Sequence, residues 1–354
     1  MSGKGVGCVA SQDIGKGSLV LRELPLLVKS EETYKHHSII KSFLAMSAED
    51  QEEYLKLHNN YEVACVEDSD DWSDAMRNEF HVALPILATF SGICMARATD
   101  VWGIFKTNTF TDGVYLKMSR FNHSCHPNAE IFGNQDTNNS TDLRALRKIK
   151  QGEEITICYI DEDKSVWSRE ERRAEMKTFY NFDCKCVGCD MTGEQIQQEK
   201  EKIEAFKEQV VKRETVQVMK SMADDDHEER LQWIREELDC VKQMYKLAKT
   251  IKPMNRGWML DHIVEQGFIL ACSGAEEEFK LGGLLDSRED EKKAWTGEAK
   301  KFAIVGLGIA TTLFGGDNLR TQLWEDRGAD PMRFYLGSSF NRVAKLSLHH
   351  PLAE

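Results

Sequence analysis

Three cysteines within six residues constrain the fold of this chain more than any other feature. The spacing Cys184-Lys185-Cys186-Val187-Gly188-Cys189 lets a loop fold around one ion, but it strains a disulfide between such near neighbours. A structural zinc site is tetrahedral and needs four ligands. One ligand must therefore come from elsewhere, and we predict that it is Cys125, which lies in an earlier polar stretch.

That polar stretch, residues 120–128, reads Arg-Phe-Asn-His-Ser-Cys-His-Pro-Asn. Taken alone, it fits a plain polar loop as well as a site. Its amide and imidazole side chains can hold hydrogen bonds in a fixed pattern, and Pro127 stops a helix from running through it. A zinc ion bound by Cys125 and the three later cysteines would fasten two distant segments together. His123 or His126 could replace Cys125 as the fourth ligand, and the sequence leaves that alternative open.

A different interpretation makes Cys125 a catalytic thiol activated by His123 or His126. Residues that are adjacent or two apart in a turn rarely bring a thiol and an imidazole into the required approach. The cysteine triplet would also have no role, so we favour the metal site. The remaining cysteines are predicted to pack as small apolar side chains, including Cys65, Cys94 and Cys158.

Composition narrows the class of protein. A chain of 354 residues with 41% hydrophobic residues can form two or three globular domains. It has neither an apolar run of about 18 residues nor an apolar signal core at its start, which predicts a nuclear or cytoplasmic location. The formal net charge of -13 disfavours binding to nucleic acid or anionic membranes and favours Lys-rich or Arg-rich partners.

The first half of the chain alternates between β and helical patterns. Glycine-rich turns at 3–7 and 15–17 lead into short strands, and the first of them lacks the preceding strand and following helix of a phosphate loop. Helical periodicity from 31 to 98 includes Ser47 as an N-cap. Extended structure is predicted at 101–110 and 114–118.

The next segments predict a hairpin of strands 129–132 and 143–146, a third strand at 154–159, and a helix that starts with a capping box at Ser168 and reaches about Phe179. Beyond Asp190 the strand patterns end. Amphipathic helices, which predict a bundle or repeat array, follow at 195–222, 228–251, 258–272 and 300–313.

Three motifs in this order resemble the SET-domain protein lysine methyltransferases of the SMYD-like branch. They are Asn122-His123-Ser124-Cys125-x-Pro127-Asn128, Gly152-Glu153-Glu154-Ile155-Thr156-Ile157-Cys158-Tyr159, and Cys184-x-Cys186-x-x-Cys189. The resemblance covers residues 3 to about 190. It implies an α+β fold of small β-sheets in which the Asn122 segment threads beneath the loop ending at Tyr159, in a knot-like arrangement.

The resemblance also implies a division into parts. We expect a SET domain at 1–183 with a helical insert at about 31–98, followed by a zinc-binding post-SET segment at 184–190. An α-helical C-terminal domain, of tandem helix-pair (TPR-like) type, is predicted at 191–354. SMYD proteins carry a zinc-binding MYND finger inside the insert, but here the insert holds only two cysteines. The finger, and any binding it would confer, is therefore not carried over.

The resemblance implies S-adenosylmethionine as methyl donor and one structural zinc ion. Lys4 would meet the donor's carboxylate, while Asn122 and His123 would contact its amino-acid and adenine portions. Asn108 would contact further polar atoms of the donor. Phe182 would pack against the adenine or the lysine channel.

Tyr159 would be the catalytic tyrosine, and Tyr180 a second wall of the lysine channel. Methyl transfer to an amine is an in-line displacement that depends mainly on alignment. The substrate ammonium must first lose its proton, which aromatic walls and a nearby sulfonium favour by lowering the lysine pKa. The Tyr159 hydroxyl could then orient the amine.

The sequence thus predicts a protein lysine N-methyltransferase that acts, as a monomer, on a Lys-rich protein or peptide, histone or otherwise, and binds neither nucleic acid nor membrane. The alternative from another class is a catalytically inactive zinc protein that keeps the SET fold as a protein-interaction module. Tyr159, Asn122 and His123 weigh against that alternative, since a pure interaction module has no need of them.

Overall fold

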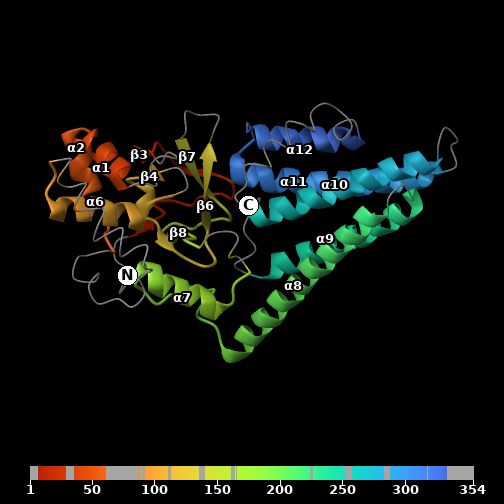
Figure 1. Ribbon diagram of the computed structural model, residues 1–354, viewed down its shortest axis with the longest axis horizontal. Coiled ribbons are helices and arrows are strands. Elements are labelled where there is room, and N and C mark those ends of the chain that lie inside the picture. The colour runs from red at the N-terminus through yellow and green to blue at the C-terminus, as the bar shows by residue number, and fades with distance from the viewer. Residues whose placement is uncertain are drawn as a thin grey trace.

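The structure is a computed structural model that describes residues 7–28, 36–60, 85, 89, 92–110, 113–134, 140–160, 164, 166–223, 226–251, 257–282, 288–316 and 318–332. Small sheets and short helices gather at one end of the molecule, and long helices extend from them at the other end (Figure 1). The chain is therefore an α+β protein in which the polar stretch and the cysteine triplet both lie in the sheet-containing part.

Two small sheets frame the polar stretch. In the first, β8 (Glu154–Ile157) lies between β1 (Cys8–Val9), which is antiparallel to it, and β5 (Asn122–His123), which is parallel. The register places Asn122 opposite Thr156 and His123 opposite Ile157. This parallel pairing brings the two segments named by the sequence motifs side by side, as the resemblance implied.

The second sheet has the order β2 (Leu19–Glu23), β7 (Ser140–Ala145), β6 (Ala129–Asn134), and a two-stranded sheet pairs β3 (Leu27–Val28) with β4 (Gly113–Val114). The predicted hairpin is confirmed as β6 and β7. The strand predicted at 114–118 is shorter than expected, because the chain turns into a 3-10 helix at Met118–Arg120.

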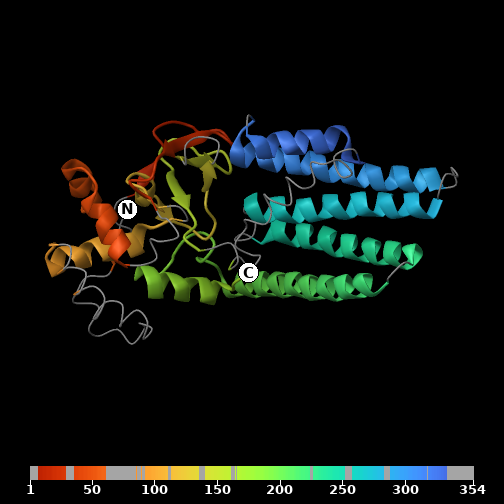
Figure 2. The same ribbon diagram turned by 45° about the horizontal axis from the view of Figure 1, so that its top comes forward.

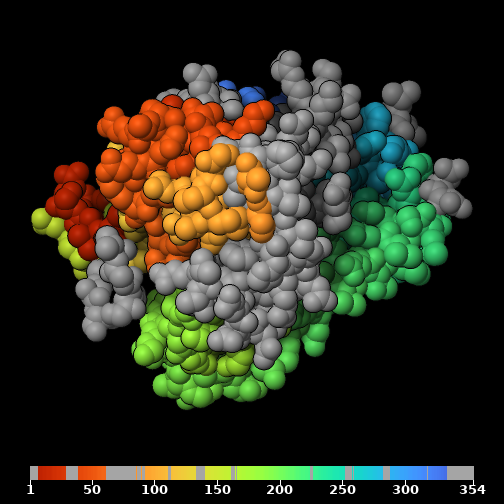
Figure 3. Space-filling view, turned by 60° about the vertical axis from the view of Figure 1, so that its left-hand side comes forward, coloured from red at the N-terminus to blue at the C-terminus, as the bar shows by residue number. Residues whose placement is uncertain are grey.

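The helical insert contains α1 (His36–Leu44), α2 (Ala48–Tyr54) and α6 (Met95–Asn108), which lie together at one end of the molecule (Figure 3). Ser47 caps α2 as predicted, since its side chain accepts a hydrogen bond from the Asp50 amide. Much of the helical periodicity predicted from 31 to 98 falls outside the described residues, including all of 61–84.

The prediction of extended structure at 101–110 is wrong, because α6 runs through Asn108. The segment is rich in β-branched and aromatic residues, which favour strands when taken alone. Its buried residues, however, include Ala98, Val101, Trp102 and Phe105, whose spacing is that of one helix face. Packing of this face against α1 and α2 overrides the local preference.

Helix α7 (Arg169–Tyr180) starts with the predicted capping box, in which Ser168 and Glu171 exchange side-chain and backbone hydrogen bonds. It ends at Asn181, which adopts the left-handed conformation with φ 54. This sharp end turns the chain back toward the sheets. It places Phe182 and the cysteine triplet next to β8.

The long helices are α8 (Gly193–Met222), α9 (His227–Thr250), α10 (Gly257–Gly282), α11 (Glu289–Phe314) and α12 (Leu319–Ala329). They lie side by side in chain order (Figure 2). Helices α10 and α11 are longer than predicted, and α12 was not predicted. None of the helices in the described ranges is long and apolar enough to cross a membrane.

Glycines that would weaken isolated helices make room here for tryptophan rings. A Cβ atom on Gly274 would lie 2.5 Å from the Trp295 ring, and one on Gly306 would lie 2.5 Å from the Trp324 ring. Both tryptophans are buried in the core that these helices share. Close packing therefore offsets the low helix propensity of glycine.

Candidate active site and metal centre

The polar stretch is fixed to β8 by one buried side chain, Asn128. Its Nδ2 donates to the Glu154 carbonyl at 2.8 Å, and its Oδ1 accepts from the Thr156 amide at 2.8 Å. The side chain is 2% exposed. Because an amide that both donates and accepts can satisfy two backbone groups at once, Asn128 holds the register of the two segments.

Asn122 projects from the start of β5 toward β8. Its Nδ2 donates to Glu154 Oε1 at 2.8 Å. A Cβ atom at Gly7 would lie only 2.4 Å from this Nδ2, so the backbone at Gly7 passes directly over the Asn122 amide. Glycine at position 7 therefore makes room for the Asn122 side chain.

His123 is buried and connects Tyr159 to Cys125. Its Nδ1 accepts from the Tyr159 backbone amide at 3.0 Å, and its Nε2 lies 3.2 Å from the Cys125 sulfur. Since Nδ1 is an acceptor, the neutral ring carries its proton on Nε2 and donates it to the sulfur. One imidazole therefore fixes the backbone at Tyr159 and one of the thiols together.

The Tyr159 side chain is held by its hydroxyl group. Its hydroxyl donates to the Phe121 carbonyl at 2.7 Å. Burial, with a smaller effect from Glu154, raises the pKa of Tyr159 to about 12. The hydroxyl is therefore neutral near pH 7 and remains a hydrogen-bond donor.

Aromatic rings surround Tyr159. The Tyr180 ring centroid lies 4.9 Å away and that of His123 lies 5.3 Å away, while Phe182 is 6.1 Å from His123. Tyr159, Tyr180 and Phe182 are all partly buried and pack against the cysteines. Such a group of rings offers an apolar environment next to a fixed hydroxyl donor.

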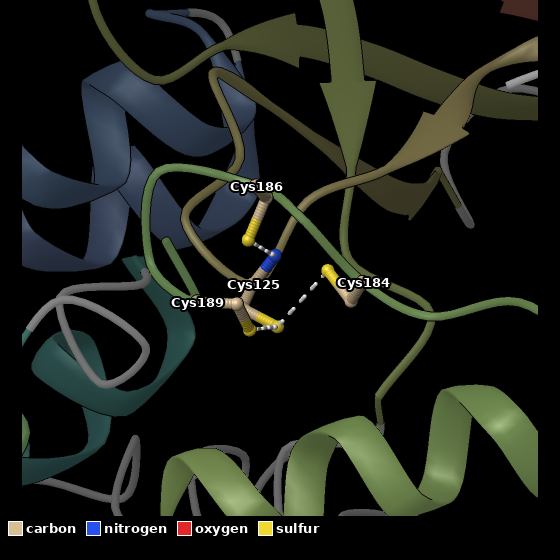
Figure 4. Close-up of side chains that lie close together, drawn as sticks. All are labelled: Cys125, Cys184, Cys186 and Cys189. Atoms are coloured by element: carbon tan, nitrogen blue, oxygen red, sulfur yellow. Dashed lines mark hydrogen bonds between the residues drawn. The ribbon is translucent and has the colours of Figure 1, made fainter. Parts of the chain in front are cut away.

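Four cysteines form the second half of the site, and we call Cys125, Cys184, Cys186 and Cys189 the cysteine cluster (Figure 4). All four are buried, and their sulfur atoms lie within 4.8 Å of one another. The Cys125 sulfur is 3.5 Å from that of Cys189 and 4.0 Å from that of Cys184. These distances are too long for a disulfide.

The cysteine cluster fits a tetrahedral zinc ion. Zinc–sulfur bonds of about 2.3 Å place tetrahedral ligand atoms about 3.8 Å apart, close to the separations found here. The hydrogen bond between Cys125 and Cys184 raises the pKa of the first thiol and lowers that of the second. Four thiolates so close together cannot all ionise unless a cation offsets their repulsion. A bound zinc would supply that charge, and its chemistry here would be structural.

The comparison with known families agrees with this geometry. A family model described as the SET domain matches residues 5–160. The chain contains a SET domain. The matched range ends directly after Tyr159 and includes the whole polar stretch, while the cysteine triplet and the long helices lie beyond it.

Relatives of this SET domain include the "Histone-lysine N-methyltransferase SMYD3" of Mus musculus, which is 44% identical over 77 residues, and "Histone-lysine N-methyltransferase Smyd1" of the same organism, 31% identical over 116 residues. The matches cover 22% and 27% of this chain, but only 17% and 23% of those proteins. The "Putative SET domain-containing protein L678" of Acanthamoeba polyphaga mimivirus is 26% identical over 215 residues, covering 58% of this chain and 81% of that protein.

The structure brings together most of the side chains that the sequence singled out in and after the SET domain. The group contains Asn122, His123, Tyr159, Tyr180, Phe182 and the cysteine cluster. Asn108 lies at the end of α6, where its Nδ2 donates to the carbonyls of His58 and Ile104 at 2.7 and 2.8 Å. Lys4 lies outside the described residues.

Two residues near the site were missed by the sequence reasoning. Glu154, in the second motif, accepts from the Asn122 amide. Arg172, on α7, is 1% exposed and reaches the carbonyl of Gly188 inside the cysteine triplet. The sequence signal for Glu154 was its place in the motif ending at Tyr159, but Arg172 looked like one more charged residue of a capped helix.

Proposed function

We propose that this SET-domain protein is an S-adenosylmethionine-dependent protein lysine N-methyltransferase. The observation that carries the proposal is the Tyr159 hydroxyl, which is neutral, donates to the Phe121 carbonyl and is enclosed by the rings of His123 and Tyr180. The relatives whose printed names state histone-lysine N-methyltransferase activity support the same reaction.

In the proposed mechanism, the aromatic rings favour a neutral lysine amine by excluding water from its charged form. The Tyr159 hydroxyl, held by the carbonyl of Phe121, the residue before Asn122, orients the amine for in-line attack. S-adenosylmethionine would supply the electrophilic methyl group. The residues proposed to hold it are Asn122, His123 and Phe182, with Lys4 and Asn108 as further contacts.

A cavity of about 430 Å³ borders Phe121, the residue before Asn122, although none of the residues proposed to hold the donor lines it. It is lined by Cys8 of β1, Glu53 of α2, and Arg120 and Phe121 of the polar stretch, among others. Phe121 therefore borders the cavity while its carbonyl holds the Tyr159 hydroxyl. Volumes of this size suit a small organic ligand.

The cysteine cluster would act through structure rather than chemistry. By joining Cys125 of the polar stretch to the triplet, a zinc ion would hold Tyr180 and Phe182 against Tyr159. We propose the division of the chain into a SET domain at 1–183, a post-SET segment at 184–190 and a helical domain at 191–354 on this basis. The acidic balance of the chain makes a Lys-rich protein its proposed substrate.

The test is a lysine-peptide array incubated with S-adenosylmethionine and read by mass spectrometry. The proposal predicts methyl groups on lysine side chains within particular sequences. A protein that binds the donor in calorimetry but methylates no peptide or protein lysine would instead support the inactive interaction module.

A further inference from the structure

Arg172 is a buried cation that reaches three different parts of the molecule. Its Nη1 donates to the Trp167 carbonyl at 2.7 Å, at the start of α7. Its Nη2 donates to the Gly188 carbonyl at 3.1 Å and to Glu199 Oε2 on α8 at 3.0 Å. Arg172 is 1% exposed and Glu199 is 8% exposed. A guanidinium with its donors in a rigid fork suits such a three-way contact.

We infer that Arg172 is a positioning residue that couples the cysteine metal site to the C-terminal helices. This inference rests on the proposed metal site and is independent of methyl transfer. It states that metal binding and the fixing of α8 belong to one linked equilibrium.

The first step is the hold of Arg172 on the loop 184–189. Gly188 lies between two of the metal-binding positions, and a Cβ atom there would be 3.5 Å from Cys125 Cβ. The loop is therefore tightly packed, and the carbonyl that Arg172 binds can move little without moving Cys189. A second arginine of α7, Arg169, donates its Nε to the Cys189 carbonyl at 2.6 Å.

The second step is charge. A divalent ion neutralises only part of the charge of four thiolates, so the filled site is anionic. Cys125 and Cys189 both interact electrostatically with Arg172 and favour its charged form. Because Arg172 is buried, this attraction is weakly screened, and the cation stabilises the filled site more than an apolar side chain could.

The third step is the direction of α8. Only the residues 190–192 connect the loop to this helix, and Thr192 caps it. Glu199 lies six residues after the start at Gly193, roughly 9 Å along the helix axis. The ion pair with Arg172 thus fixes α8 at a second point. Helix α8 makes a sharp angle with α7 and runs along the other long helices (Figure 1).

Because the two events are thermodynamically linked, metal binding stabilises the position of α8 and the fixed position of α8 stabilises metal binding to the same extent. Metal binding orders the loop and so presents the Gly188 carbonyl to Arg172. Arg172 held by Glu199 in turn presents an ordered loop to the metal. Removing either side chain should therefore weaken metal binding, although neither touches the ion.

The experiment measures zinc affinity by competition with a chromogenic chelator in the full chain. Arg172→Met should bind zinc about 10-fold more weakly than the parent, the lower end of the range for partners of metal ligands. Glu199→Gln should also weaken zinc binding. The double variant should lose less affinity than the sum of the two single losses, because Arg172 and Glu199 act through one shared contact. Parent-like zinc affinity in Arg172→Met would overturn the inference.

Arg213→Met is the matched control. Arg213 lies on α8, the helix that carries Glu199, and pairs with the buried Glu237 at 3.1 Å, in the contact between α8 and α9. It should lower stability without changing zinc affinity. An equal loss of affinity in this control would show a general effect of destabilisation and would overturn the specific role of Arg172.

Hydrogen exchange adds a second readout. Removing zinc from the parent should speed amide exchange in the first turns of α8, and Arg172→Met should show the same pattern with zinc present. If Arg172→Met does not fold, Glu199→Gln alone decides, and unchanged exchange in α8 together with unchanged zinc affinity would refute the coupling. A parent chain that binds no zinc would refute the metal site on which the inference rests, a result distinct from failure of methyl transfer.

Discussion

At the scale of single residues, neighbouring side chains of the polar stretch make different contacts. Asn128 holds the register of the two segments, Cys125 joins the metal site, and His123 lies between them, with one ring nitrogen on Tyr159 and the other toward Cys125. Asn122, at the start of β5, donates from its side-chain amide to Glu154. The stretch therefore joins the proposed metal site to the proposed catalytic site within seven residues.

Tyr159 gives a prediction about pH. Its pKa is about 12 in the folded chain against an ordinary value of 10.0, so the folded state holds the proton more tightly than the unfolded state. The resulting stability is fully present below pH 10 and is lost as pH rises toward 12. Between pH 9 and 11 the parent should lose about 1 kcal/mol more of its free energy of unfolding than Tyr159→Phe does. Urea unfolding of both proteins measures this, and equal pH dependence would contradict the burial of the hydroxyl.

Asn122 gives a prediction about donor binding. Asn122→Ala should weaken S-adenosylmethionine binding about tenfold, the loss expected for one hydrogen bond to a charged ligand. Glu154→Gln is the matched control, since its amide oxygen can still accept from Asn122. Calorimetry of both variants measures the affinities. Parent-like affinity in Asn122→Ala would place the donor elsewhere.

The spacing of sequence motifs predicted which cysteines lie together. Cys125 was predicted as the fourth cysteine from chemistry alone, and the sulfur positions confirm that the four come together. Asn108 shows the limit, because the sequence did not predict that its side chain binds the carbonyls of His58 and Ile104 at the end of α6. Local sequence does not reveal which backbone groups a buried amide must satisfy.

At the scale of elements, caps and turns were the predictable features. Ser168 and Glu171 specify the start of α7, and its left-handed end at Asn181 delivers the cysteine triplet to β8. The nature of α6 was not predictable from propensity, because Val101 and Trp102 favour a strand until the insert packs around them. Burial of α6 in the folded chain therefore determined that this segment is a helix.

The loop 184–189 gives the prediction at this scale. Cys186→Ser should lower the zinc content below that of the parent, because a serine oxygen is a poor substitute for a thiolate ligand. Its stability should also fall, since the loop would lose the bond that orders it. Metal analysis of the purified proteins measures the stoichiometry. The control is Cys240→Ser, which changes a buried cysteine of α9 outside the cluster and should keep the parent zinc content.

At the scale of the whole molecule, contacts at several places join the sheet-containing part to the long helices. Arg172 joins α7 and the cysteine loop to α8. On the other side, the Phe132 ring of β6 packs 5.2 Å from the Phe314 ring of α11, and the buried Glu130 accepts from the Gly257 amide at the start of α10. The sequence predicted the helices by their periodicity, but not these joints. Each depends on partners that are distant in the chain.

The central claim is that Tyr159 promotes methyl transfer to lysine at this site. The most direct measurement compares the transfer rate of the parent and Tyr159→Phe on the best peptide from the array, with both proteins loaded with zinc. We expect a loss of about 100-fold or more, typical for removal of one polar group that positions the reacting atoms, with zinc content and donor affinity unchanged. Equal rates in the two proteins would contradict the account.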